Sequence, residues 1–315
     1  PRFGFKRGEL IIDIIHLSTY LQEMKNDSSF LNLPLTLKEA LKNWDHNLKI
    51  FKDLDNQLLN ENLNAKTKNG FKISQLESEI QFLAPVPNPP SFRDFYAFEQ
   101  HVRSARKLRG LEMHPDWFKI PIFYFSNANA VYGHKASIPY PKMTQELDFE
   151  LEFAVIIANG GSDIDHNNAD NYIAGYTICN DWSARDLQRE EMAMSLGPAK
   201  GKDFATSFGP YLITPDELEN KWDDRGKLHL RMTCHVNDKL ISDGNTNDLY
   251  HPFSKMIERA SMNTRLNPGD YIGSGTVGTG CILELRPENT GGWLKKGDKI
   301  KLEVEELGVL ENTIV

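Results

Sequence analysis

One short stretch, Leu147–Phe153, constrains the fold of this 315-residue chain more than any other segment. Acidic and apolar residues alternate along it, and successive side chains of a β-strand point to opposite faces. Asp148, Glu150 and Glu152 are therefore expected on one face of a strand, with apolar side chains on the other. The apolar run at 154–157 follows directly, so we expect this strand to continue into a core.

Carboxylates beside a core repel one another and lose hydration unless a positive charge lies between them. A bound divalent cation would supply that charge, and Mg²⁺ and Ca²⁺ prefer oxygen ligands. The alternative is a strand face in water, where the charges are solvated and need no cation. The strand alone leaves both interpretations open.

The composition limits the class of partner. Hydrophobic residues make up 40% of the chain and charged residues 25%, as in ordinary globular proteins. The net charge of −8 argues against nucleic acid or an anionic membrane. No apolar run approaches the roughly 20 residues of a membrane span, and no signal-peptide pattern is present. Cys179, Cys234 and Cys281 form neither a CxxC pair nor a disulfide framework, so we expect a cytoplasmic protein.

The Pro-rich segment at 84–90 marks a boundary, because Pro interrupts both helices and strand ladders. We predict a small N-terminal α/β domain at residues 1–82 and a larger domain at 83–315. The larger domain is mostly β, which makes the fold class α+β. Predicted strands are 9–15, 120–125, 172–179, 211–214, 228–236, 281–285 and 300–304; predicted helices are 37–56, 92–109, 185–194 and 253–259.

Two further acidic residues are candidate ligands. Asp181 follows a predicted strand, where ligand-binding residues are common. Ser183 and Asp186, just after it, fit a helix capping box, which gives Asp186 a structural role and leaves Asp181 without one. Asp94 could bind a ligand, or it could cap the predicted helix at 92–109 together with Ser91.

His101 lies seven residues after Asp94, two helical turns, so both side chains could face one side. Glu284 stands alone in an apolar run and needs a partner; His101 is a candidate. Lys202 follows a Gly-containing loop that fails the phosphate-loop spacing, so it is a candidate contact for an anionic substrate. Four glycines within 273–280 suggest tight turns or close approach to a ligand.

Taken together and in this order, these segments resemble the fumarylacetoacetate hydrolase family over about residues 82–305. The resemblance implies the metal ligands Asp94, Glu150, Glu152 and Asp181. It implies the catalytic residues His101, Glu284, Lys202 and Gln188, and the substrate contacts Tyr96, Arg109, Tyr124, Gln188, Lys202 and Thr276. Arg109 lies eight residues after His101 where the family has nine, and the loop after 273–276 is shorter than in animal-type enzymes.

The resemblance also implies a mixed β-sandwich roll as the catalytic domain, a homodimer, and Mg²⁺, with Mn²⁺ or Ca²⁺ as alternatives. The implied reaction is metal-dependent cleavage of a carbon–carbon bond in a β-diketo acid. The leading substrate is fumarylacetoacetate, from tyrosine and phenylalanine breakdown. Glu284 would orient His101, which would take a proton from water, while Lys202 and Gln188 would stabilise the oxyanion. The alternatives are an acylpyruvate hydrolase, a decarboxylase or hydratase of the family, or a non-catalytic metal-binding domain.

Overall fold

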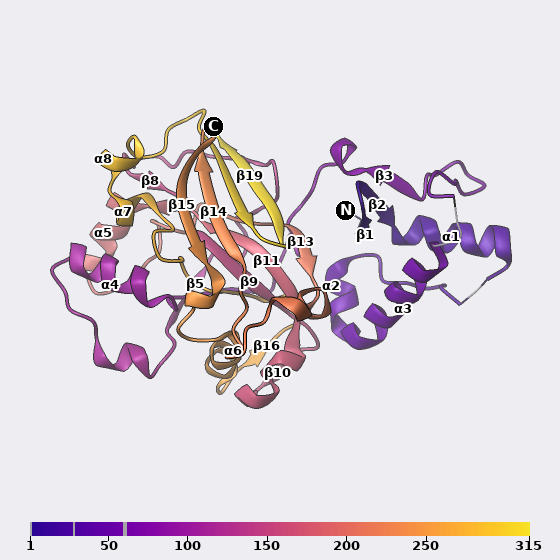
Figure 1. Ribbon diagram of the computed structural model, residues 1–315, viewed down its shortest axis with the longest axis horizontal. Helices are drawn as coiled ribbons and strands as arrows, with labels where there is room; N and C mark the ends of the chain where they lie inside the picture. The colour runs from indigo at the N-terminus through magenta and orange to yellow at the C-terminus, as the bar shows by residue number, and fades with distance from the viewer. Residues whose placement is uncertain (1, 28, 59–61) are drawn as a thin grey trace. The chain divides into compact units, whose positions relative to one another are not determined.

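The computed structural model describes residues 2–27, 29–58 and 62–315. The chain divides into two compact units, residues 1–81 and 82–315. In the first unit, three strands form an antiparallel sheet and two longer helices accompany it (Figure 1). Its elements are β1 (Gly4–Arg7), β2 (Leu10–Asp13), α1 (Ile14–Lys25), α2 (Leu37–Ala40), α3 (Trp44–Gln57) and β3 (Ser74–Leu76).

The expected strand at 9–15 is shorter than predicted, because Asp13 caps α1 by accepting a hydrogen bond from the backbone N–H of His16. The expected helix at 37–56 is present in two parts, α2 and α3, separated by a 3₁₀ turn at Leu41–Asn43. Thr36 and Glu39 form a capping box at the start of α2.

The second unit contains a seven-stranded sheet in the order β5-β4-β17-β9-β11-β13-β6 and a five-stranded sheet in the order β15-β14-β18-β19-β7. The first comprises β4 (Phe92–Phe95), β5 (Phe123–Ser126), β6 (Val131–Tyr132), β9 (Leu151–Ile157), β11 (Ile173–Asp181), β13 (Thr206–Ile213) and β17 (Tyr271–Gly273). The second comprises β7 (Ser137–Ile138), β14 (Arg231–Val236), β15 (Lys239–Asn245), β18 (Lys299–Val304) and β19 (Gly308–Ile314). Figure 1 shows the two sheets packed against each other as a curled β structure.

Two small ladders and five α-helices, besides short 3₁₀ helices, also belong to the described part of this unit. The ladders join β8 (Leu147–Asp148) to β12 (Ser183–Ala184), and β10 (Gly161–Ser162) to β16 (Arg265–Leu266). The helices are α4 (Glu99–Leu108), α5 (Arg185–Ala193), α6 (Phe253–Ser261), α7 (Ile282–Leu285) and α8 (Pro287–Thr290). No helix among residues 2–27, 29–58 and 62–315 combines the length and apolar character that a membrane crossing requires.

The core lies between the two sheets and buries β9 completely, as the run of apolar residues predicts. Phe153 of β9 packs edge-on against Phe253 of α6, with ring centroids 5.0 Å apart. The alternation at 147–153 is confirmed, with one modification: the strand is interrupted at Phe149 and Glu150, between β8 and β9. This interruption separates Asp148 from the strand that carries Glu152.

Two predicted elements are wrong. Residues 92–95 form a strand, and the helix begins only at Glu99. The spacing of Phe92, Phe95 and Phe98 suits a helix, but the backbone of β4 pairs with both β5 and β17, and this pairing outweighs the local pattern. Residues 282–285 form α7 and not a strand, so Glu284 lies on a short helix.

Candidate active site

The four carboxylates expected to hold a metal converge over inner strands of the seven-stranded sheet. Asp94 lies on β4, Glu152 on β9 and Asp181 at the end of β11, while Glu150 directly precedes β9. One carboxylate oxygen from each residue lies within 4.8 Å of the other three. All four residues are at most 5% exposed. The strand face is therefore buried, and the solvated alternative is excluded.

Gly273 on β17 makes the approach of Asp94 and Glu152 possible. It pairs with Asp94 on one side and with Ala154 on the other. A Cβ atom on Gly273 would lie 2.3 Å from Asp94 Oδ1, closer than two such atoms can stand. The side chain of Asp94 fills the space that any larger residue here would need, which is why the loop at 273–280 begins with Gly.

The electrostatics of the four carboxylates are unbalanced. Burial and the charges of Asp181 and Glu150 raise the pKa of Asp94 well above its ordinary value. Burial and the neighbouring carboxylates likewise raise the pKa of Glu152 well above its ordinary value. Burial would also raise the pKa of Glu150, but Lys202 and Arg185 outweigh it and lower that pKa to about 2. Lys202 and Arg185 thus neutralise charge at Glu150, whereas Asp94 and Glu152 lack such a cation.

The side without cations fits a bound metal. Among the described residues, Asp94 Oδ1 and Glu152 Oε2 are buried and have no hydrogen-bond partner. Buried carboxylate oxygens normally have a partner, so two neighbouring orphans indicate a missing positive group. The donor set is made only of oxygen, as hard divalent cations require. Lys202 and Arg185 contact Glu150 and Asp181, so a divalent cation would supply positive charge to Asp94 and Glu152, which form no ion pair with either side chain.

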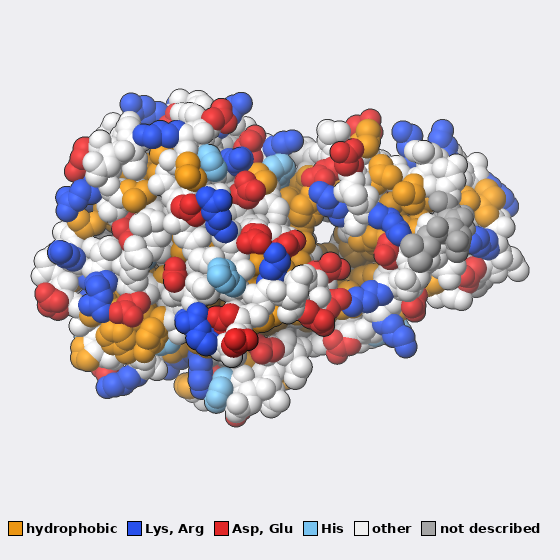
Figure 2. All heavy atoms as spheres, in the orientation of Figure 1, with side chains coloured by type: hydrophobic (Ala, Val, Ile, Leu, Met, Phe, Trp, Pro, Cys, Tyr) orange, Lys and Arg blue, Asp and Glu red, His pale blue; other side chains and the backbone are white. Residues whose placement is uncertain are grey.

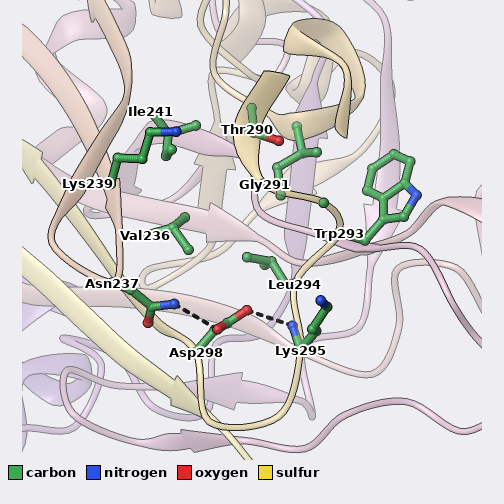
Figure 3. Close-up of a pocket in the computed structure, with 12 residues that line it drawn as sticks. Val236, Asn237, Lys239, Ile241, Thr290, Gly291, Trp293, Leu294, Lys295 and Asp298 are labelled. Carbon is green, nitrogen blue, oxygen red and sulfur yellow. Dashed lines mark hydrogen bonds between the residues drawn. The ribbon is translucent and has the colours of Figure 1, made fainter. Parts of the chain in front are cut away.

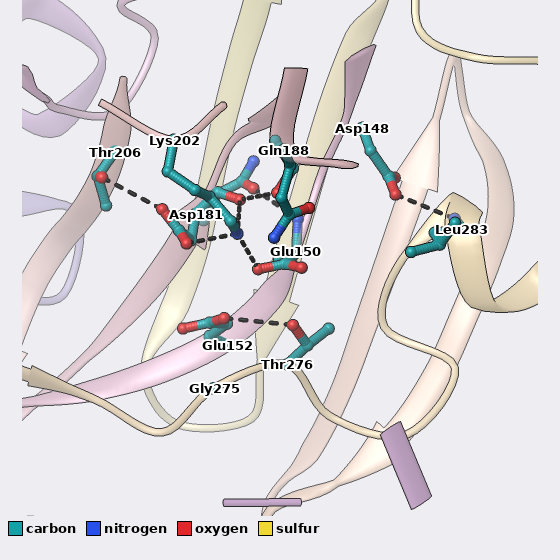
Figure 4. Close-up of polar contacts among 12 residues, drawn as sticks. Asp148, Glu150, Glu152, Asp181, Gln188, Lys202, Thr206, Gly275, Thr276 and Leu283 are labelled. Carbon is teal, nitrogen blue, oxygen red and sulfur yellow. Dashed lines mark hydrogen bonds and ion pairs between the residues drawn. The ribbon is translucent and has the colours of Figure 1, made fainter. Parts of the chain in front are cut away.

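Lys202 lies between Asp181 and Glu150 (Figure 4). Its Nζ donates to Asp181 Oδ2 at 2.6 Å and to Glu150 Oε2, and the side chain is 4% exposed. Burial would lower the pKa of Lys202, but the two carboxylates outweigh it and raise that pKa, so the amine stays charged. Tyr124 also donates its hydroxyl to Asp181.

His101 on α4 and Glu284 on α7 form the expected pair. The distance from His101 Nδ1 to Glu284 Oε2 is 3.0 Å, and both side chains are 5% exposed. Burial would raise the pKa of Glu284, but its hydrogen bond with His101 outweighs burial and lowers that pKa. His101 is also among the groups whose electrostatic influence lowers the pKa of Glu150, so the pair lies near the carboxylate cluster.

The expected substrate contacts lie around these two groups, with one difference. The ring of Tyr96 meets that of His101 edge-on at 5.6 Å, and burial raises the pKa of Tyr96 to about 12. Thr276 donates to Glu152 Oε1 at 3.4 Å (Figure 4). Gln188 accepts a hydrogen bond from Arg185 Nη1 at 3.1 Å. Arg109 differs in being exposed: its Nε donates to the carbonyl of Ala105, and its positive charge opposes the effect of burial on the pKa of Tyr96, so it lies near that ring.

A hollow of about 310 Å³ adjoins Tyr96. Its lining is Tyr96, Val102, Arg106, His114, Asp116, Trp117, Ile120 and Ile122. Ile120 and Ile122 are exposed, and Figure 2 shows hydrophobic side chains gathered on the visible face beside the segment that joins α4 to β5. An apolar part of a substrate could be accommodated here, next to the candidate catalytic histidine.

A larger hollow of about 450 Å³ lies elsewhere in the second unit, between β15 and the segment before β18 (Figure 3). At its floor Asp298 accepts hydrogen bonds from Asn237 Nδ2 at 2.8 Å and from the backbone N–H of Lys295 at 2.7 Å. None of the residues predicted for the active site lines it. It therefore forms no part of the candidate active site.

The predicted capping box of Ser183 and Asp186 is wrong. Ser183 Oγ donates to the carbonyl of Asp181, and Asp186 accepts from Thr144 Oγ1 and from the backbone N–H of Gln145. Asp186 is structural, as expected, but it ties α5 to the segment before β8. The reason is that β12 pairs with β8, which holds Ser183 in extended conformation.

Sequence reasoning missed Arg185, which is buried at the start of α5. Its Nε lies 2.8 Å from Asp148 Oδ2 and its Nη1 lies 2.8 Å from Glu150 Oε1. Its Nη2 is buried without a hydrogen-bond partner in the described part of the chain. The sequence signal that could have indicated its burial is the position of the arginine four residues after Asp181, in a segment that also contains Trp182 and Ala184. Asp148, grouped with Glu150 by the alternation, pairs with Arg185 and does not join the four-carboxylate cluster.

Comparison with known proteins agrees with this arrangement. The family model described as fumarylacetoacetate (FAA) hydrolase C-terminal matches residues 91–315. The chain is similar to the mitochondrial oxaloacetate tautomerase FAHD2B of Bos taurus, with 32% identity over 239 residues, 76% of this chain and 70% of the relative. It is also similar to the fumarylacetoacetase of Arabidopsis thaliana, with 29% identity over 281 residues, 71% of this chain and 66% of the relative.

Among solved structures, the fold resembles that of fumarylpyruvate hydrolase from Pseudomonas aeruginosa in complex with Mn²⁺ and pyruvate. The TM-score is 0.59 at 22% identity, covering 76% of this chain and 93% of that one. The predicted α+β, mostly β roll is confirmed. A family model that covers residues 91–315, together with a relative that is 32% identical over most of both chains, shows that this chain belongs to the fumarylacetoacetate hydrolase family.

Proposed function

We propose that this protein is a divalent-metal-dependent hydrolase that cleaves a carbon–carbon bond in a β-diketo acid, with fumarylacetoacetate as the leading substrate. The observation that carries the proposal is the buried cluster of four carboxylates beside the His101–Glu284 pair. A non-catalytic metal site would need the carboxylates alone. A buried histidine held by a carboxylate next to that cluster is the arrangement of a general base.

The residues of this chain would divide the chemistry between them. A divalent cation held by Asp94, Glu150, Glu152 and Asp181 would polarise the carbonyl under attack. Glu284 accepts from Nδ1 of His101, which leaves Nε2 free of a proton and able to take one from water. The hydroxide would attack the carbonyl, the carbon–carbon bond would break, and the departing carbon would leave as an enolate. Lys202 and Gln188 would stabilise the oxyanion.

The oxaloacetate tautomerase relative supports a second candidate activity. Tautomerisation moves a proton between the carbon and oxygen of a keto acid and needs no water. His101 could carry that proton without activating a nucleophile. The two activities share the carboxylates and the His–Glu pair, and they differ in whether water reaches the carbonyl.

The direct test is to follow the ultraviolet absorbance of fumarylacetoacetate, a series of acylpyruvates and oxaloacetate, each with Mg²⁺ and with a chelator. Metal-dependent loss of fumarylacetoacetate far above the acylpyruvates supports the leading proposal. Turnover of acylpyruvates alone keeps the reaction and changes the substrate. Faster keto–enol exchange of oxaloacetate without cleavage of any diketo acid establishes the tautomerase and rejects the hydrolase.

The remaining expectations are proposals of the same kind. Oxygen ligands accept Mg²⁺, Mn²⁺ and Ca²⁺, and we propose Mg²⁺ as the native ion. The Mn²⁺ in the fumarylpyruvate hydrolase complex supports a divalent cation at such a site. A homodimer and a cytoplasmic location also stay predictions, which sedimentation and localisation of the tagged protein would test.

A further inference from the structure

Asp148 lies outside the four-carboxylate cluster, yet it is fully buried and both of its carboxylate oxygens accept hydrogen bonds. Its Oδ1 accepts the backbone N–H of Ile282 at 2.8 Å. Its Oδ2 accepts that of Leu283 at 3.0 Å (Figure 4). Arg185 Nε donates to the same Oδ2 at 2.8 Å. The residue is 0% exposed. No substrate or metal role is needed to explain these contacts, but they end at the helix that carries Glu284.

That helix depends on outside support. α7 has four residues, too few for a helix to be stable alone, and its N-cap Cys281 makes no side-chain capping bond. The two amides that Asp148 accepts are the first two of this helix. A residue 134 positions away in sequence thus provides the cap. Because Glu284 is the next residue along α7, this anchor holds the backbone that carries its carboxylate, while Thr279 and Ser104 contact the carboxylate itself.

Arg185 joins the anchor to the carboxylate cluster. The guanidinium bridges Asp148 and Glu150, and its side chain is 3% exposed. A continuous buried path therefore runs from Glu150 through Arg185 and Asp148 to the start of α7. The path ends at the hydrogen bond between Glu284 and His101.

We propose that Asp148 is a positioning residue, which sets the His101–Glu284 pair against the carboxylate cluster by anchoring α7. The inference rests on the proposed function of His101 and Glu284 as the base and its orienting partner. Asp148 acts only through α7 and touches no reacting atom. Residues of this kind, one step behind the reacting groups, typically change activity 10- to 100-fold.

The test is Asp148→Asn, read first by nuclear magnetic resonance of the ring N–H protons and only then by kinetics. In the wild type the Nδ1 proton of His101 donates to Glu284, and Glu284→Gln identifies its resonance by shifting it. We expect Asp148→Asn to move this resonance in the same direction. Asp270→Asn is the matched control: Asp270 is also buried, accepts a backbone N–H and pairs with a buried arginine, but it does not contact α7.

A double-mutant cycle of Asp148→Asn and Glu284→Gln, read by kcat, tests the same proposal kinetically. We expect Asp148→Asn to lower kcat about 10- to 100-fold in the wild type and less than about threefold in a Glu284→Gln background, because the anchor acts through Glu284. KM and Mn²⁺ affinity should stay within about threefold of the wild type. Asp270→Asn should leave kcat unchanged in both backgrounds.

Two results would overturn the proposal. In the first, the His101 resonance does not move and Asp148→Asn lowers kcat equally in the wild type and in the Glu284→Gln background. In the second, Mn²⁺ affinity is lost while kcat is intact, which would assign Asp148 to the metal cluster. Should Asp148→Asn not fold, Leu283→Pro removes one anchoring amide and keeps the ion pair with Arg185, since Pro is accepted in the first turn of a helix. If the wild type turns over none of the test substrates, the proposed function fails, while the resonance experiment still decides the positioning role.

Discussion

His101 Nδ1 lies 3.0 Å from Oε2 of Glu284, a residue 183 positions further along the chain. Both side chains are 5% exposed, and they come from two helices that the core brings together. Protein interiors rarely bury a glutamate unless it has a partner, and here the partner is His101. Here the pair also faces a carboxylate cluster, which makes it the part of the site whose removal is most informative.

His101→Ala should lower kcat by about 10²–10⁴, the usual contribution of a general base. Mn²⁺ binding, measured by calorimetry, should stay close to that of the wild type, because the imidazole is not among the four oxygen donors. His166→Ala is the surface control: His166 pairs with Glu258 at 2.8 Å, and both side chains are about one third exposed. Turnover that survives His101→Ala unchanged would remove His101 as the base.

Stability should depend on pH in opposite ways with and without metal. The pKa values of Asp94 and Glu152 are raised in the folded protein. Above about pH 4, the ordinary pKa of a carboxyl group, the folded state therefore binds more protons than the unfolded state. The metal-free protein therefore loses stability as pH rises through these raised values. Glu150, with a pKa of about 2, acts in the other direction and only in acid: its contribution is lost as pH falls from its ordinary value toward 2.

Because metal ligands must be ionised, Mg²⁺ should stabilise the protein more as pH rises. Thermal unfolding from pH 5 to 8, with Mg²⁺ and with a chelator, should give a difference in Tm that widens with pH. Asp94→Asn should reduce this widening, because it removes one of the raised carboxyls and one ligand. A constant difference across the range would contradict a metal held by these groups.

Lys202→Met should destabilise the metal-free protein by about 3–5 kcal/mol, since it leaves the buried carboxylate of Asp181 without a cation and Glu150 with Arg185 alone. Saturating Mg²⁺ should recover more stability in this variant than in the wild type, because the ion replaces part of the missing charge. Chemical unfolding with and without Mg²⁺ measures both. Lys221→Met offers a comparison, since Lys221 bridges Glu305 and Glu306 at the surface and its loss should change little.

Tyr96→Phe should raise KM by roughly threefold to tenfold with a smaller change in kcat, the size expected for one lost hydrogen bond. With a pKa of about 12, the phenol of Tyr96 is a neutral donor throughout the working range, so the effect should be the same from pH 6 to 9. Tyr250→Phe, whose hydroxyl lies 3.4 Å from the carbonyl of Phe118, is the control. A change in kcat alone would place the Tyr96 hydroxyl at the reacting atoms.

Much of the site could be predicted because its signals are local. Alternation along 147–153 predicts which carboxylates share a face, and the position of Asp181 at the end of a strand predicts it as a candidate ligand. The four carboxylates and the His101–Glu284 pair do come together in the structure. The helix expected at 92–109 is wrong for its first turns, because a helical spacing of phenylalanines cannot report that neighbouring strands will pair with that backbone.

The sequence by itself determined the composition of the site: oxygen ligands, a candidate base and a lysine, in an order that resembles one family. Only the tertiary structure decided which charges neutralise which. Arg185 and Asp148 are ordinary polar residues in the sequence, and their importance comes from burial together with α7 and Glu150. Likewise Gly273 matters because β17 lies beside Asp94. Burial and pairing across long sequence separations set these energies, and no local pattern encodes them.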